Sequence, residues 1–115
     1  LYFGLRTQGM AGKERYTLAK LKEAQRYYVL AIKALDEAIG AQKNGLDPGL
    51  AQIFEVNLKE INGTIRTCEQ IVEEDPNNLA ARAYLLTVYR DKVTILEEMM
   101  GAKKASSEKR TALAL

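Results

Sequence analysis

The chain contains the turn sequence GLDP at residues 45–48 and a related turn, DPNN, at residues 75–78. In each turn an aspartate can cap the start of a helix, and the proline after it suits a first helical turn, where its missing N–H is not needed. Gly45 can take the left-handed conformation that ends a preceding helix. No sustained alternation of apolar and polar residues, which is typical of a strand, competes with this pattern. The two turns therefore predict three helices in succession.

The residues between the turns repeat with a helical period. We expect helices over about residues 14–44, 48–74 and 76–101. The second helix carries a single apolar stripe with steps of four and three: Phe54, Leu58, Ile61, Ile65, Cys68 and Val72. Steps that average 3.5 residues favour shallow, coiled-coil-like packing. The predicted fold is all-α, an elongated antiparallel three-helix bundle or a long helical hairpin.

The third helix differs because it carries two apolar stripes side by side. One stripe is Leu85, Val88, Ile95 and Met99, and the other is Leu86, Tyr89, Val93, Leu96 and Met100. A helix with an apolar face of double width is best placed against two neighbours, or against one neighbour and a partner molecule.

The two ends of the chain lie outside this pattern. Residues 1–12 begin with LYFG, which looks like the remnant of a protease-cleavage tag, and we expect them to be disordered. An ordinary native N-terminus would give the same expectation. Residues 13–102 form the predicted domain, and residues 103–115 are predicted to be a frayed tail. No stretch approaches the roughly 20 apolar residues that cross a bilayer.

The composition argues against catalysis. Among 115 residues there is no His, no Trp and one Cys, which excludes a His-containing metal site, a Ser-His-Asp triad and an intramolecular disulfide. The chain contains neither a glycine-rich phosphate loop nor a nucleophile elbow. A net charge of +2 gives no reason to expect nucleic acid as a partner. We therefore expect a non-enzyme without metal or cofactor, in which Cys68 is a small buried hydrophobe.

Candidate partner-contact residues come from the tyrosines and from the third helix. Tyrosine is enriched at protein interfaces because it combines rigid apolar area with a polar tip. Tyr28 and Tyr89 lie in apolar stripes and are expected in the core, whereas Tyr27 and Tyr84 lie beside the stripes. The predicted contact residues are Tyr27, Tyr84, Ile95 and Met99. The expected partner is another protein or a second copy of the chain.

Five segments together resemble a known family. They are YVLAIKAL (28–35), LDP (46–48), NLKEINGTI (57–65), EDPNN (74–78) and YRDKVTIL (89–96). In this order and spacing they resemble the C-terminal helical region of bacterial membrane-anchored zinc-finger anti-sigma factors. The resemblance implies a sensory or assembly role in transcription regulation, on the extracytoplasmic (periplasmic) side of the inner membrane. Zinc and sigma-factor binding belong to another part of such proteins and map to no residue here.

Two alternatives stay open, and with them a cytoplasmic location. The DPNN turn followed by a tyrosine-bearing helix is also how many tetratricopeptide repeats begin, and a break near Arg90 would favour that adaptor fold. Residues 80–100 contain no Gly, Pro or Asn to make such a break. The other alternative is a free-standing coiled-coil oligomerisation module, favoured if the double stripe of the third helix is buried only in a dimer.

Overall fold

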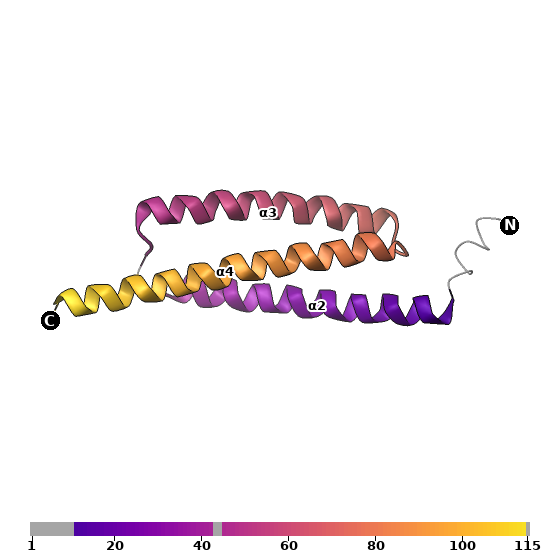
Figure 1. The fold of residues 1–115 in the computed structure, drawn as a ribbon, viewed down its shortest axis with the longest axis horizontal. Coiled ribbons are helices and arrows are strands. Elements are labelled where there is room, and N and C mark those ends of the chain that lie inside the picture. The colour runs from indigo at the N-terminus through magenta and orange to yellow at the C-terminus, as the bar shows by residue number, and fades with distance from the viewer. Residues whose placement is uncertain (1–10, 43–44, 115) are drawn as a thin grey trace.

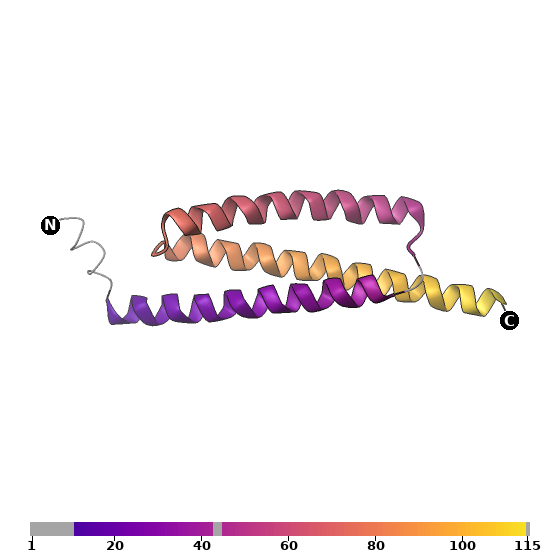
Figure 2. The ribbon, with the colours of Figure 1, turned by 180° about the vertical axis from the view of Figure 1, so that it is seen from behind.

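The computed structural model describes residues 11–42 and 45–114, which form three long helices: α2 (Gly12–Ala41), α3 (Pro48–Glu74) and α4 (Leu79–Ala114). Helix α4 packs against both α2 and α3 (Figure 1). Helices α2 and α4 run in the same direction and α3 runs antiparallel to both, as the reverse view also shows (Figure 2). The molecule measures 74 × 22 × 16 Å. The predicted elongated all-α bundle is confirmed.

Helix α4 is the central element of the bundle. Within the described residues no Cα atom of α2 lies within 8 Å of one in α3, so the backbone of each outer helix approaches α4 and not the other outer helix. Leu85 and Leu96 of α4 have exposed fractions of 0% and 1%. The buried core cluster draws on all three helices: Ile32, Ile39, Ile65, Cys68, Val72, Leu85, Val88, Tyr89 and Leu96. The double apolar face of α4 is therefore covered by two neighbours from the same chain.

The cap at the start of α3 is as predicted. Asp47 Oδ2 accepts hydrogen bonds from the backbone N–H groups of Gly49 (3.2 Å) and Leu50 (3.3 Å), and Pro48 occupies the first turn. Helix α2, however, ends at Ala41 and not near residue 44, because Gln42 adopts an extended conformation. No described glycine has a positive φ, so the left-handed conformation expected at Gly45 is wrong.

The turn before α4 is capped by Asn78 and not by its aspartate. Asn78 Oδ1 accepts a hydrogen bond from Ala81 N (2.9 Å), and α4 begins at Leu79 and not at residue 76. Asp75 instead ends α3, and its carbonyl accepts a hydrogen bond from Asn78 N (3.1 Å). Both side chains are good helix caps, and the turn places the amide at the start of the helix.

The predicted frayed tail is wrong for residues 103–114, which continue α4 to Ala114. These residues include alanine, lysine, glutamate and arginine, which have high helix propensity, and no proline stops the helix. Lys103 Nζ also donates a hydrogen bond to Ile39 O (3.1 Å), which ties α4 to the end of α2. The end of α4 projects past the other two helices (Figure 1). Residues 1–10 of the predicted tag remnant lie outside the described residues.

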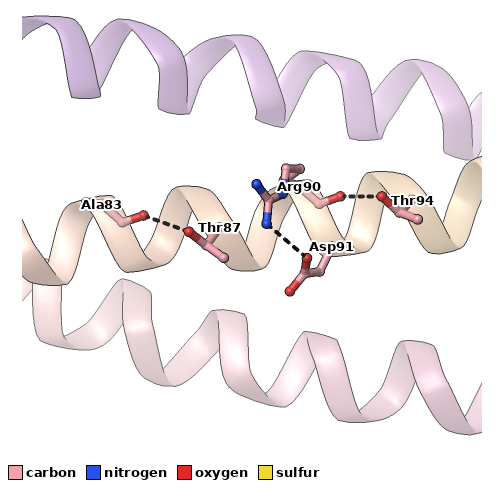
Figure 3. Close-up of polar contacts among 5 residues, drawn as sticks. All are labelled: Ala83, Thr87, Arg90, Asp91 and Thr94. Carbon is pink, nitrogen blue, oxygen red and sulfur yellow. Dashed lines mark hydrogen bonds and ion pairs between the residues drawn. The ribbon is translucent and has the colours of Figure 1, made fainter.

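Helix α4 is continuous, and polar side chains lie on its outward side between residues 87 and 94. Figure 3 shows Thr87 and Thr94 donating hydrogen bonds to the carbonyls of Ala83 (3.4 Å) and Arg90 (3.2 Å), with α2 and α3 on either side. Arg90 and Asp91 form an exposed ion pair (3.9 Å). The helix therefore lacks the turn near Arg90 that a tetratricopeptide repeat requires.

A substitution at Ile65 tests this packing. Ile65 is buried in the core, so Ile65→Asp places an unpaired carboxylate among apolar side chains. We expect the free energy of unfolding to fall by at least about 3 kcal/mol. The neighbouring Thr64→Asp, at an exposed position, should cost less than about 1 kcal/mol. Urea unfolding followed by far-UV circular dichroism measures both, and equal stabilities would contradict the core assignment.

Candidate functional site

The structure places the four predicted contact residues on two helices. Tyr27 of α2 and Tyr84 of α4 are exposed, at 75% and 57%. Ile95 and Met99 of α4 are half-buried, and Met99 packs against the core. Tyr84 and Met99 lie about 22 Å apart along α4 at 1.5 Å per residue. The four side chains therefore do not form one patch, and the apolar face of α4 that motivated Ile95 and Met99 is largely used within the chain.

Helix α2 has a second stripe on the side away from α4, made of tyrosine and alanine with one lysine and one glutamate. We call it the outer face of α2. Its members recur every three or four residues: Tyr16, Lys20, Glu23, Tyr27, Ala31, Ala34 and Ala38. At 100° per residue this stripe lies roughly opposite the buried residues Leu18, Ile32 and Ile39. Tyr16 is 66% exposed, and Ala34 and Ala38 are also exposed. No other described helix covers this face.

Side-chain size changes along the outer face, and net charge changes along α2 as a whole. Its bulky residues lie in the N-terminal half, where Lys20 sits 5.6 Å from the centroid of the Tyr16 ring and pairs with Glu23 at 3.3 Å. Its C-terminal half is alanine. Residues 12–26 carry five basic and two acidic side chains, whereas residues 27–41 carry one basic and two acidic. The helix is thus positive at one end and slightly negative at the other.

The groups with reactive potential are buried in the core. Cys68 is buried, as expected, and burial followed by the nearby Glu69 charge raises the pKa of its thiol, which disfavours the reactive thiolate. Tyr89 is also buried, and its hydroxyl donates a hydrogen bond to Glu69 Oε2 at 2.6 Å. Within residues 11–42 and 45–114, no three His, Cys, Asp or Glu side chains are grouped to hold a metal ion. None of the described helices has the length and apolarity needed to cross a membrane.

Sequence reasoning missed a buried arginine. Arg82 is only 6% exposed. Its Nη1 donates to Gln25 Oε1 of α2 (2.7 Å) and its Nη2 to the carbonyl of Pro76 (3.3 Å), which links α2, α4 and the preceding turn. The signal was present in the spacing, because Arg82 lies four residues before Leu86 and so continues one apolar stripe. Gln25 likewise lies three residues before Tyr28, which packs against the core.

Tyr89 predicts a loss of stability at high pH. Burial, followed by its hydrogen bond to Glu69, raises the pKa of Tyr89 above its ordinary value of 10.0. The contribution of Tyr89 to the free energy of unfolding is complete below pH 10, where the tyrosine of the unfolded chain is also protonated. It decreases as the pH rises further. We expect the free energy of unfolding of Tyr89→Phe, measured with urea, to fall much less than that of the wild type between pH 9 and 11.5. Tyr84→Phe, at an exposed position, is the control, and identical pH profiles for all three proteins would contradict the prediction. The pKa of Cys68 is also raised, but this residue is present in all three proteins and so does not account for a difference between them.

Comparisons of the chain with protein families, with curated proteins and with solved structures find no match. The resemblance to anti-sigma factors therefore rests on the residue pattern alone and stays a prediction. What the chain does must be inferred from the surfaces that its helices expose.

Proposed function

We propose that the chain is a non-catalytic interaction domain that works by self-association, and that the outer face of α2 is the contact between two copies. The observation that carries this proposal is the exposure of Tyr16 and Tyr27 on a helix face that no other described helix covers. Rigid aromatic side chains in such a position are typical anchors of protein interfaces.

Side-chain size favours an antiparallel pairing of two α2 helices. A two-fold axis near Tyr27 places the two Tyr27 side chains against each other. The same axis places Tyr16 of each copy opposite Ala38 of the other, because both lie 11 residues from Tyr27. Away from the axis, large side chains then meet small ones, and alanine allows the helix backbones to approach closely there. A parallel pairing would set Tyr16 against Tyr16 and leave the alanines apart.

Charge favours the same orientation. In an antiparallel pair the basic half of each α2 faces the slightly acidic half of the other, whereas a parallel pair sets the basic halves together. Burial of a large apolar side chain contributes about 1.5–3 kcal/mol. The free energy gained by burying the four tyrosines of two copies is therefore similar to the association cost of about 4–15 kcal/mol. The dimer we propose is therefore weak and responds to concentration by mass action.

The regulatory setting is part of the proposal. The residue pattern of segments 28–35, 57–65 and 89–96 supports a helical region of an anti-sigma-type transcription regulator on the periplasmic side of the inner membrane. There, pairing of α2 would bring two copies together in response to a signal. The parent reading frame tests this setting. His and Cys zinc ligands followed by one membrane span upstream would support it, whereas their absence would favour a free-standing oligomerisation module with the same contact.

Light scattering tests the contact itself. We expect a concentration-dependent rise from monomer to dimer mass, and we expect Tyr27→Ser to weaken dimerisation by more than about tenfold in Kd, because one substitution removes both central tyrosines. Tyr84→Ser removes an equally exposed tyrosine from α4 and should leave the dimer unchanged. A wild-type chain that stays monomeric at about 1 mM, or equal effects of the two variants, would contradict the proposal.

Cysteine cross-linking tests the orientation. The native Cys68 is buried, so an introduced thiol on α2 dominates mild oxidation. We expect Tyr27→Cys to form a disulfide dimer by itself. Tyr16→Cys should cross-link when mixed with Ala38→Cys, because a disulfide needs Cα atoms within about 7 Å. Efficient cross-linking of Tyr16→Cys with itself would show a parallel pair instead.

A further inference from the structure

An open hollow of about 500 Å³ lies where α2 meets the start of α4. Six residues line it: Lys22, Gln25, Arg26, Val29, Leu30 and Arg82. Three of the six are cations and none is acidic. Val29 and Leu30 are exposed, and they give the hollow an apolar wall beside its basic one. Its size falls within the range of ligand-binding pockets, about 300–1,000 Å³.

The charge in this hollow has no counter-ion among the described residues. Both hydrogen-bond acceptors of Arg82 are neutral, namely the amide oxygen of Gln25 and the carbonyl of Pro76. Its buried Nε–H has no acceptor within residues 11–42 and 45–114. Within the described residues, Lys22 and Arg26 make no ion pair with a carboxylate either. A buried cation without an anionic partner destabilises the fold, so an anion that enters the hollow relieves this cost.

We propose that the hollow binds a small amphiphilic oxyanion, a carboxylate or phosphate ester with a short alkyl chain. The oxyanion contacts Lys22, Arg26 and Arg82 through charge-assisted hydrogen bonds, which are stronger than neutral ones. The alkyl chain lies against Val29 and Leu30. This site is separate from the proposed contact between two copies, which is centred on Tyr27, so either proposal can fail while the other stands.

The choice of a small amphiphile follows from the lining. An inorganic anion would leave the apolar wall exposed, and a neutral apolar molecule would leave the three cations unpaired. A molecule with both parts satisfies both walls at once. The planar guanidinium groups of Arg26 and Arg82 suit the two oxygens of a carboxylate or the oxygens of a phosphate ester.

Nuclear magnetic resonance titrations test the site directly. The probes are octanoate and octyl phosphate, with 1-octanol and inorganic phosphate as comparators that lack one of the two parts. We expect saturable shifts of the backbone amides of Lys22, Arg26 and Arg82 with either amphiphile, and a shift of the Arg82 side-chain Nε–H signal. Which amphiphile binds more tightly identifies the head group. Equal affinity for 1-octanol or for inorganic phosphate, or no saturable binding of either amphiphile, would overturn the proposal.

Variants assign the binding to these cations. We expect Arg82→Gln to raise the Kd for the bound amphiphile about tenfold. Because Arg82 also bonds to Gln25 and Pro76, its loss can disturb the fold, so the surface double variant Lys22→Gln/Arg26→Gln provides an independent test. It should fold normally and bind several-fold more weakly. Lys33→Gln removes an exposed cation of α2 outside the hollow and should bind as the wild type does. Wild-type affinity in the double variant would overturn the proposal.

Discussion

The bundle depends on burial of the apolar face of α4, which is too wide for one neighbouring helix to cover. Leu85 and Leu96 lie in the middle of that face and are fully buried, which requires side chains from both outer helices. Burial of this face is the main favourable term, since each large apolar side chain contributes about 1.5–3 kcal/mol. The two outer helices meet this need without approaching each other closely.

An outer helix with one neighbour must leave most of its circumference exposed. Helix α4 meets water with the threonines, Arg90 and Asp91 of Figure 3, and its two large exposed apolar side chains, Tyr84 and Leu113, lie far apart along the helix. The exposed apolar residues of α3 are divided between its two ends, with Ile53 and Val56 near the start and Ile71 near the finish. Only α2, among the described helices, carries two exposed tyrosines followed by a run of alanines on one side of the helix. These differences in exposed surface are why the proposed contact lies on α2.

The sequence predicted those features that depend on local chemistry or on clear periodicity. Both ends of α3 follow from the Asp47 cap, Pro48 and the apolar stripe that ends at Val72. The start of α4 was misplaced because Asp75 and Asn78 are both good caps, and the choice between them depends on how the turn closes. Residues 103–114 were misjudged because loss of the apolar rhythm indicates loss of packing, whereas helix formation needs only propensity and the absence of a stop. Among the contact residues, spacing alone could not show that two neighbours would cover the face containing Ile95 and Met99.

The two candidate sites are both departures from the usual pattern, in which apolar residues are buried and charges are exposed. Tyr27 is an apolar residue on the outside, and Arg82 is a charge on the inside. Each is unfavourable for the isolated chain, because exposed aromatic surface promotes association and a buried cation lacks its counter-ion. When a sequence follows the usual rules of burial and charge elsewhere, its departures from them tend to lie at binding sites. Both departures involve α2, Tyr27 directly and Arg82 through Gln25, so a ligand beside Arg82 would lie on the same helix that pairs two copies. A ligand in the hollow and a second copy on the outer face would therefore bind to different sides of one helix, and any coupling between them requires that the ligand bind monomer and dimer with different affinities.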